Sequence, residues 1–237
     1  MRAVSPPIMT PFGPELWLCD GPVMTGAAGF RFPTRMGVAR LPDGGLWVWS
    51  PVALTPDVRG AVDALGPVRH LVAPNTLHTT FLAEWVRTYP GAKVHAAPGL
   101  TADDLGIAID AVLADAPHLA WGGATEQVIV RGNRITTEVV FFHRPSATVL
   151  ITDLVQHLPS DWYRGWRGIV ARLDRMTAAE PSVPRKFRLA TTNRRTARAA
   201  VDRILAWPAE RLVMAHGPPV EANASDVLRR AFGWLVR

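Results

Sequence analysis

The sequence predicts one layered α/β domain in which β-strands and α-helices alternate along the chain. The 237 residues are 48% hydrophobic with a mean hydropathy of +0.09, as expected of a globular domain with its own core. No internal repeat, low-complexity tract or long linker divides the chain, so residues 1–237 form a single domain. Apolar runs of strand length alternate with segments of helical spacing, which favours sheets covered by helices.

The N-terminal part predicts a lead-in, three strands and one helix. Residues 1–14 are rich in proline and predict an irregular lead-in. Strands are expected over 16–19, 36–41 and 46–49, the first ended by Asp20-Gly21-Pro22 and the last two joined by a turn at 42–45. Thr55 as N-cap, Pro56 at the first helical position and Asp57 in the first turn predict a helix that continues to Leu65.

The rest of the chain predicts further strands and four longer helices. Strands are expected over 68–73, 93–97, 126–130, 136–142, 148–152 and 212–215. Helices are expected over 78–89, 162–176, 196–207 and 225–236, and residues 98–124 should hold loops and one short helix. Four apolar residues of the central strands, Phe141, Phe142, Val149 and Ile151, should lie in the core.

Cysteine content and hydropathy exclude several protein classes. Cys19 is the single cysteine, which excludes an internal disulfide framework and a zinc site built on several thiolates. No apolar run approaches the roughly 18–20 residues of a membrane span. Because Pro6, Pro7 and Pro11 interrupt any signal-peptide core, we expect a cytoplasmic protein.

The charge of the chain is uneven. Residues 119–237 carry 18 basic and 10 acidic groups, and 11 of these basic groups lie between Arg164 and Arg203 against three acidic ones. This Arg-rich segment 164–203 is either a solvated helix face or a surface for an anionic partner. The chain has no RNA-binding signature and no basic module interleaved with aromatic residues, so a nucleic-acid partner is not expected.

Polar side chains follow four predicted strands directly. These residues are His78, His143, Asp153 and His216. Strand exits meet at one edge of a sheet, where α/β proteins commonly build their sites. Three imidazoles and one carboxylate suit one Zn²⁺ or Fe ion. Of the other histidines, we expect His95 to be structural, His70 to face solvent, and His118 and His157 to lie in loops.

Four stretches of the sequence resemble the metallo-β-lactamase fold superfamily. They are Phe32-Pro33-Thr34-Arg35-Met36, 71–81, 137–153 and 204–217. More closely, the chain resembles a bacterial and plastid branch of this superfamily that is known only as a domain of unknown function. The resemblance covers almost the whole chain and implies an αββα sandwich of two mixed sheets with helices on both outer sides.

The superfamily's loop motif His-x-His-x-Asp-His is degenerate here. With its last histidine placed on His78, the other His, His and Asp positions hold Ala73, Asn75 and Leu77. The resemblance therefore implies that one of two family metals is lost and the other keeps His78, Asp153 and His216.

The same resemblance matches His143 to a family histidine, and His143 could be a fourth ligand or a proton donor. Asn75 stands where the family has an imidazole and could accept or donate a hydrogen bond in the site. Glu138, on the strand before His143, either supports the ligands or is an exposed strand residue.

Two functions from different classes remain open. The first is a mononuclear metal-dependent hydrolase of a small ester, lactone or thioester, with a metal-bound water as the nucleophile. The second is a degenerate, non-catalytic member that binds a ligand or a partner, which Leu77 in place of the family's aspartate favours. The sequence leaves the oligomeric state open.

The predicted helix over 162–176 carries a continuous apolar face. Trp162, Trp166, Ile169, Val170 and Leu173 recur at helical spacing, and the arginines fall mainly away from them. This face either packs on the sheet or stands free to contact a membrane surface or a second subunit. Because helices at this place often roof the site in the superfamily, we expect Trp162 or Trp166 to line the entrance and the arginines to favour an anionic substrate.

Overall fold

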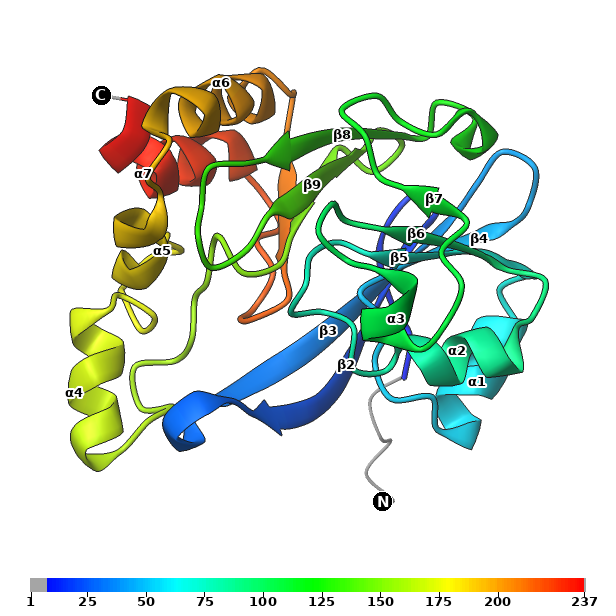
Figure 1. Ribbon diagram of the computed structural model, residues 1–237, viewed down its shortest axis with the longest axis horizontal. Helices are drawn as coiled ribbons and strands as arrows, with labels where there is room; N and C mark the ends of the chain where they lie inside the picture. The colour runs from blue at the N-terminus through cyan, green and yellow to red at the C-terminus, as the bar shows by residue number, and fades with distance from the viewer. Residues whose placement is uncertain (1–7, 237) are drawn as a thin grey trace.

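The computed structural model describes residues 8–236 and has four layers. Two β-sheets face each other in the middle, and helices cover the outer side of each sheet (Figure 1). Helices α6 and α7 lie on one outer side, while α1 and α2 lie on the other. This arrangement confirms the expected αββα sandwich.

The first sheet contains seven strands in sequence order, β1 to β7. Their bounds are β1 Thr10–Gly13, β2 Leu16–Thr25, β3 Arg31–Arg40, β4 Leu46–Trp49, β5 Val68–Ala73, β6 Lys93–Ala96 and β7 Ala111–Val112. Strands β1 to β4 pair antiparallel, and β4 to β7 pair parallel. The parallel strands β4 and β5 therefore end at the same edge of this sheet.

The second sheet contains four strands in the order β11-β10-β9-β8. Their bounds are β8 Thr125–Val130, β9 Glu138–His143, β10 Thr148–Ile151 and β11 Arg211–Met214. Strand β10 runs parallel to β11 but antiparallel to β9. As a result, the ends of β10 and β11 lie at one edge together with the beginning of β9.

The helices complete the outer layers and the connections. Their bounds are α1 Pro56–Asp63, α2 Leu82–Thr88, α3 Ala102–Leu105, α4 Gly165–Leu173, α5 Arg185–Ala190, α6 Arg194–Leu205 and α7 Ala224–Val236, with short 3-10 turns η1 Ala27–Gly29 and η2 Leu119–Trp121. The described residues contain no helix long and apolar enough to cross a membrane.

The core has one apolar layer between the sheets and one under each helical layer. Successive residues of β9 point to opposite sides. Phe141 faces the first sheet and contacts Trp47 with ring centroids 5.1 Å apart, while Phe142 faces the helices and stacks on Trp207. Both phenylalanines are buried, as are Val149 and Ile151, which confirms the predicted core residues.

Local sequence signals explain the elements that were predicted well. The Thr55 side chain accepts a hydrogen bond from the Val58 N–H and begins α1 with Pro56 in its first turn. In the β3–β4 turn, the Asp43 carboxylate accepts from the Gly45 N–H, and Gly44 takes a φ of +82° that suits glycine. These short-range interactions fix the start of α1 and the conformation of the β3–β4 turn locally.

Other predicted elements were wrong in extent. Residues 10–13 of the expected lead-in form β1, and residues 1–7 lie outside the described part. Asp20-Gly21-Pro22 does not end β2, because an irregularity between Gly21 and Met24 lets the pairing with β3 continue. Helix α2 begins only at Leu82, and α5 was not predicted.

Candidate metal centre

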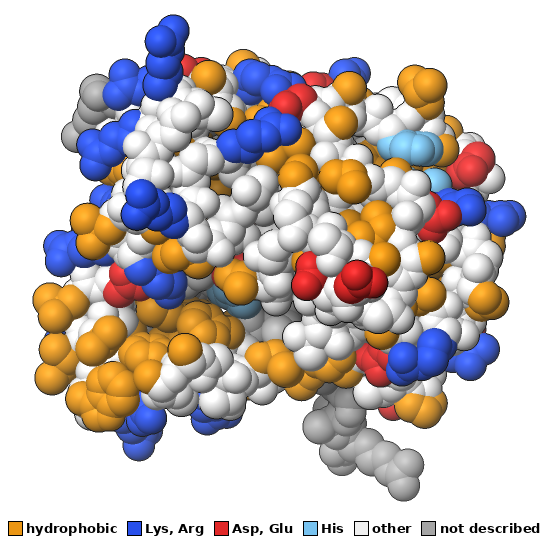
Figure 2. All heavy atoms as spheres, viewed as in Figure 1, with side chains coloured by type: hydrophobic (Ala, Val, Ile, Leu, Met, Phe, Trp, Pro, Cys, Tyr) orange, Lys and Arg blue, Asp and Glu red, His pale blue; other side chains and the backbone are white. Residues whose placement is uncertain are grey.

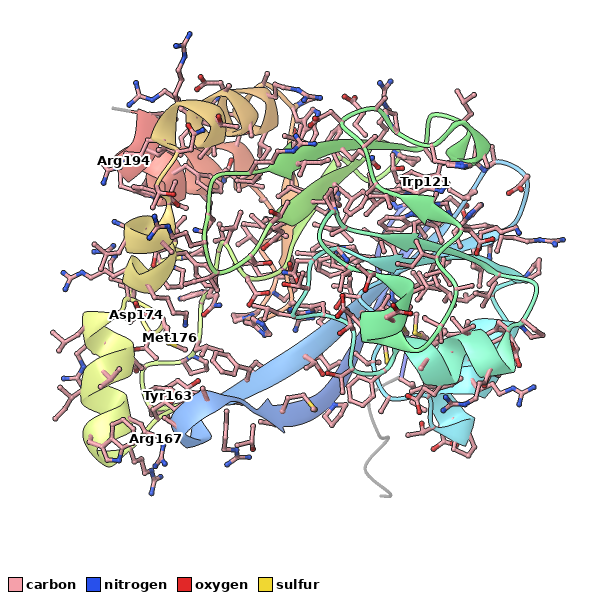
Figure 3. All side chains as sticks on the ribbon, viewed as in Figure 1. Trp121, Tyr163, Arg167, Asp174, Met176 and Arg194 are labelled. Carbon is pink, nitrogen blue, oxygen red and sulfur yellow. The ribbon has the colours of Figure 1, made fainter. Side chains whose placement is uncertain are left out.

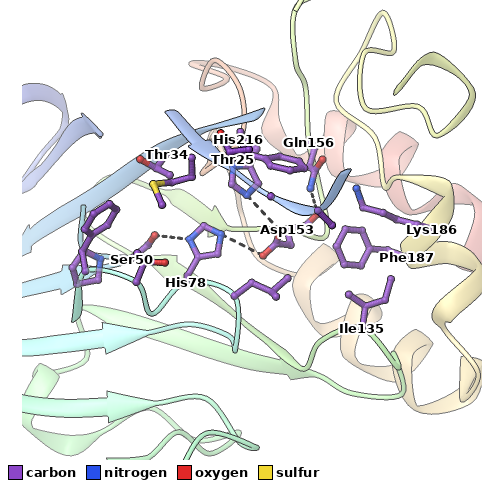
Figure 4. A pocket seen from close by; sticks show the side chains of 18 residues that line it. Thr25, Thr34, Ser50, His78, Ile135, Asp153, Gln156, Lys186, Phe187 and His216 are labelled. Carbon is purple, nitrogen blue, oxygen red and sulfur yellow. Dashed lines mark hydrogen bonds and ion pairs between the residues drawn. The ribbon is translucent and has the colours of Figure 1, made fainter. Parts of the chain in front are cut away.

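Three loops bring His78, Asp153 and His216 together at the edge where the two sheets meet. His78 follows β5, Asp153 follows β10, and His216 follows β11. The Nε2 atoms of His78 and His216 lie 3.3 Å from the Asp153 oxygens Oδ2 and Oδ1, respectively. Figure 4 shows the carboxylate between the two imidazoles. One donor atom from each residue falls within 4.8 Å of the others, which is compact enough for one metal ion.

His216 is held in one orientation by a backbone carbonyl. Its Nδ1–H donates a hydrogen bond of 2.7 Å to the Pro33 carbonyl oxygen, which can only accept. In a neutral ring the proton therefore sits on Nδ1, and the lone pair of Nε2 points at the Asp153 carboxylate. A lone pair facing a carboxylate at 3.3 Å needs a cation between them, either a proton or a metal ion.

A hydroxyl group holds His78. The Ser50 Oγ lies 2.8 Å from His78 Nδ1 and can either donate to it or accept from it. When Ser50 accepts, the His78 proton sits on Nδ1 and the Nε2 lone pair faces the cluster, as in His216. Ser50 directly follows β4 with a φ of +52°, an uncommon value for serine, and its hydroxyl lies within hydrogen-bond distance of the imidazole.

Asp153 is buried, and its neighbours favour its carboxylate form. Burial by itself would raise the pKa of Asp153, but His78 and the hydrogen bonds from His216 and His78 hold this pKa well below its ordinary value. Burial would likewise lower the pKa of His216, yet its interaction with Asp153 raises it above the ordinary value. The carboxylate therefore draws positive charge into the site.

Glu138 supports the Asp153 loop from below. Its carboxylate accepts backbone N–H bonds from Thr152 at 2.5 Å, Asp153 at 2.9 Å and Leu154 at 3.1 Å. Burial and the nearby Asp153 charge raise the pKa of Glu138 to about 7, against the opposing effect of the N–H donors. Glu138 is thus a positioning residue, and the alternative of an exposed strand residue is wrong.

The Nε2 atoms of His78 and His216 each lie 3.3 Å from a different oxygen of Asp153, which is closer to the spacing of two ligands on one metal ion than to that of a direct ion pair. Ligands bound tetrahedrally at roughly 2.0–2.2 Å lie about 3.3–3.6 Å apart, which includes the observed 3.3 Å. A direct N–H···O⁻ bond would be shorter, at about 2.7–2.9 Å. Two imidazoles and one carboxylate are the ligand types of a catalytic zinc site with an open fourth position.

The loop that carries His216 is held by residues far away in the sequence. The Arg35 guanidinium donates to the carbonyls of Met214 and Gly217 and pairs with Asp20 at 2.7 Å. Gly217 has a φ of +142°, and a Cβ there would collide with the His157 backbone. Strand β3 therefore positions His216 through both Pro33 and Arg35.

The cluster opens into a pocket of about 360 Å³ with a largely apolar wall. Its lining includes Phe32, Leu77, Phe81, Ile135 and Phe187, several of which Figure 4 shows around the cluster. Asp153 is the only carboxylate among the lining residues described. The Lys186 ammonium also lines the pocket, 3.3 Å from Asp174 and over the rings of Phe32 and Phe187.

The model of a family described as a domain of unknown function (DUF4336) matches residues 16–164. The chain belongs to this family. No curated protein matches the chain.

Solved structures of the metallo-β-lactamase fold are similar to this DUF4336 protein over nearly its full length. The metal-soaked Flv1 flavodiiron core from Synechocystis sp. PCC6803 has a TM-score of 0.66 at 13% identity over 96% of this chain, which spans 60% of that core. The metallo-β-lactamase FIM-1 from Pseudomonas aeruginosa, in its mono-zinc form, has a TM-score of 0.63 at 12% identity, covering 95% of this chain and 94% of that one.

A metallo-β-lactamase from Pontibacter korlensis is also similar, with a TM-score of 0.59 at 15% identity, covering 93% of this chain and 98% of that one. At these identities the likeness shows the fold, and the fold is that of the metallo-β-lactamase superfamily.

His143 does not join the cluster, so the expectation that it is a ligand or proton donor there is wrong. Strand β9 runs antiparallel to β10, and His143 pairs with Thr148 at the start of the strand that leads to Asp153. Asp153 lies five positions after Thr148, which is about 16 Å along an extended chain. The end of β9 lies at the opposite edge of the sheet from the end of β10, because the two strands are antiparallel and not parallel.

Asn75 lies in the site but beneath it. Its amide nitrogen donates to Asp153 Oδ2 at 2.7 Å and to Thr152 Oγ1 at 2.9 Å, while its oxygen accepts from the N–H groups of Leu77 and His78. Asn75 is fully buried and does not line the pocket. It positions Asp153 and the loop, and the structure gives it no direct contact with a substrate.

Two further expectations were wrong. His70 does not face solvent but lies buried, with its Nδ1 2.9 Å from Nε2 of the structural His95. Neither Trp162 nor Trp166 lines the pocket, because the β2–β3 hairpin lies between α4 and the cluster. Sequence reasoning gave no site role to Ser50, Pro33, Arg35 or Lys186, although Pro33 and Arg35 lie in a stretch that carries the family resemblance.

Proposed function

We propose that this protein is a mononuclear metal-dependent hydrolase of a small ester, lactone or thioester, with zinc as the first candidate metal and iron as the second. The observation that carries the proposal is the orientation of the His216 ring: its Nδ1 is held by the Pro33 carbonyl, and its Nε2 faces a buried carboxylate oxygen 3.3 Å away. His78, Asp153 and His216 would hold the ion. A bound divalent ion supplies Lewis acidity and lowers the pKa of a coordinated water toward about 7.

The chain's own residues orient the ligands and the substrate. Ser50 and Pro33 fix the two imidazole rings, and Asn75 and Glu138 fix the carboxylate and its loop. Such outer partners commonly change metal affinity by 10–100-fold when they are removed.

The pocket wall accounts for the kind of substrate. Its apolar side chains would bind an acyl group and keep bulk water away from the reacting carbonyl. The Lys186 ammonium, held by Asp174 at 3.3 Å, would favour a substrate with an anionic group at the far end.

One observation favours a non-catalytic, ligand-binding protein instead. Leu77, half exposed in the pocket, stands where the family resemblance places a metal-binding aspartate, and the described lining holds no second carboxylate. Such a member would bind an apolar ligand at the metal without turning it over.

Metal analysis followed by an ester panel separates these functions. Protein purified without added metal should contain close to one ion per chain by elemental mass spectrometry. Asp153→Ala should lose the ion, while His143→Gln, which changes a buried histidine outside the cluster, should keep it. Unchanged metal content in Asp153→Ala would refute the metal centre.

Turnover of nitrophenyl esters, lactones and acyl thioesters should disappear with chelation and return when zinc or iron is restored. If the metal-loaded protein hydrolyses none of these substrates, the hydrolase function is refuted and the alternative of a non-catalytic, ligand-binding protein is supported.

A further inference from the structure

Helix α4 presents an apolar stripe to the outside of the molecule. The stripe consists of Trp166 (53% exposed), Ile169 (61%), Val170 (40%) and Leu173 (59%). These residues recur at the helical spacing that normally marks a buried face. We call these four residues the α4 surface. Of the two alternatives for this helix, the one in which it packs its apolar face on the sheet is therefore wrong.

The opposite side of α4 is well anchored. Ala171 is buried in a small core with Leu158, Tyr163 and Met176, and Figure 3 shows Tyr163 and Met176 beside the helix. The Arg167 Nε donates to the Ala28 carbonyl at 2.9 Å, which ties α4 to the tip of the β2–β3 hairpin. The helix is thus held rigidly with its apolar stripe outward.

Positive charge surrounds the α4 surface. Residues 164–190 contain seven basic side chains and two acidic ones. Both acidic groups are already paired, Asp174 with Lys186 and Glu180 with Arg230. On α4, Arg167 and Arg172 lie on opposite sides of the apolar stripe. Among the residues that the structure describes, Arg172 has no ion-pair partner.

A second copy of the chain does not fit this surface. A two-fold interface would set the same patch on itself and bring Arg167 and Arg172 of both copies together. The four side chains also fall far short of the roughly 20–30 residues that each partner contributes to a standard interface. A lipid surface needs only a few apolar side chains flanked by cations, which is the pattern of an interfacial amphipathic helix.

The pocket and the α4 surface share a wall. The pocket lining includes three residues of the hairpin tip, Met24, Gly26 and Ala27. The carbonyl of the next residue, Ala28, accepts a hydrogen bond from Arg167 of α4. Figure 2 shows hydrophobic side chains gathered over α4 and the hairpin, beside a hollow on the same face and with basic side chains around them. A molecule docked on this surface would therefore lie close to the pocket opening.

We propose that α4 docks this protein on an anionic lipid bilayer and that the pocket takes its ester substrate from that bilayer. Trp166, Ile169, Val170 and Leu173 enter the interface between headgroups and acyl chains, and the flanking arginines meet lipid phosphates. The docking does not depend on the metal centre. The assignment of an amphiphilic, lipid-derived ester as the substrate rests on the proposed hydrolase function.

Sedimentation with vesicles tests the docking. The full chain should sediment with vesicles of equal parts phosphatidylcholine and phosphatidylglycerol and much less with phosphatidylcholine alone. Ile169→Ser combined with Leu173→Ser should lower the partition coefficient by at least about tenfold, because two aliphatic side chains no longer leave water. Leu119→Ser is the matched control, since Leu119 is 95% exposed on η2, away from α4, and should bind as the unchanged protein does.

Further arms separate the possible failures. Binding should weaken with salt as the Debye length shortens from about 10 Å at 0.1 M. Asp153→Ala should still sediment with the anionic vesicles, since it changes only the metal centre. Equal sedimentation of the double variant and the unchanged protein would overturn the docking, as would a dimer in light scattering that the double variant abolishes.

If vesicle binding is absent while soluble esters are still hydrolysed, this inference fails and the proposed function stands. If vesicles bind but no ester is turned over, the docking stands and the lipid substrate is lost with the hydrolase function.

Discussion

Acidification should destabilise this protein through His143, which lies buried at the end of β9. Its side chain is fully buried, its Nδ1 lies 2.7 Å from Ser146 Oγ, and its Nε2 has no partner among the described residues. Burial lowers the pKa of His143 from 6.5 to about 4, because an imidazolium there would lose its hydration without gaining a counter-charge. The native state therefore holds this ring neutral.

The sign and the size follow from proton linkage. A histidine whose pKa is lower in the native than in the unfolded state binds protons preferentially in the unfolded state, so stability falls as the pH drops from 6.5 toward about 4. With these two pKa values, the free energy of unfolding should fall by about 2 kcal/mol between about pH 7 and about pH 4.5 from His143 alone. His95, whose pKa burial lowers to about 3, adds a loss of the same sign.

A comparison of two proteins at two pH values isolates the contribution of His143. Urea denaturation of the unchanged protein and of His143→Gln should show a stability loss on acidification that is about 2 kcal/mol smaller in the variant. Any constant cost of the substitution cancels in this comparison, and His143→Asn serves if the glutamine variant does not fold. If both proteins lose the same unfolding free energy on acidification, the assignment to His143 is refuted. If His143→Gln loses its bound metal, His143 is a metal ligand after all.

Three further predictions test the scaffold of the site. Phe141→Ala should lower the free energy of unfolding by about 3–5 kcal/mol in urea, because it empties a fully buried position between the sheets; a loss much below 1 kcal/mol would contradict that packing. Glu138→Gln should destabilise by about 1–3 kcal/mol and weaken metal binding in titrations by roughly 10–100-fold, since one amide cannot accept all three N–H bonds. Gly217→Ala should lower both the melting temperature and the metal content, because its φ of +142° and the close His157 backbone leave no room for a Cβ; unchanged values in either variant would show that the loop adapts freely.

The order of strands and helices could be predicted because it depends on local patterns. Apolar runs, the Thr55 cap and the Asp43-Gly44 turn act within a few residues, and the structure confirms each of them. Three of the four residues expected at strand exits also converge, since β5, β10 and β11 end at the same edge. The family resemblance supplied the sandwich into which these elements pack.

The failures share a physical cause, which is dependence on partners distant in the sequence. His143 was misplaced because the direction of β9 relative to β10 is set by pairing and not by the composition of either strand. The Pro33 carbonyl and Ser50 hydroxyl act across 183 and 28 residues, and nothing near His216 or His78 announces them. The spacing of α4 left open whether its apolar face is buried or exposed, because periodicity marks a face and not what covers it.

Asn75 holds the loop that carries His78, a loop that departs from the family motif at three positions. Its side-chain oxygen accepts from the Leu77 and His78 N–H groups, at 2.8 and 3.0 Å, and its amide nitrogen reaches Asp153 across the gap between the sheets. One neutral side chain thus fixes the loop backbone and the carboxylate together.

Leu77 can then point into the pocket as apolar wall beside Ile135 and Phe187. At the position of Leu77 the family resemblance implies a metal-binding aspartate, and this chain has an apolar side chain there that lines the pocket. The departure of the loop from the family motif and the apolar character of the pocket therefore meet in one side chain, Leu77.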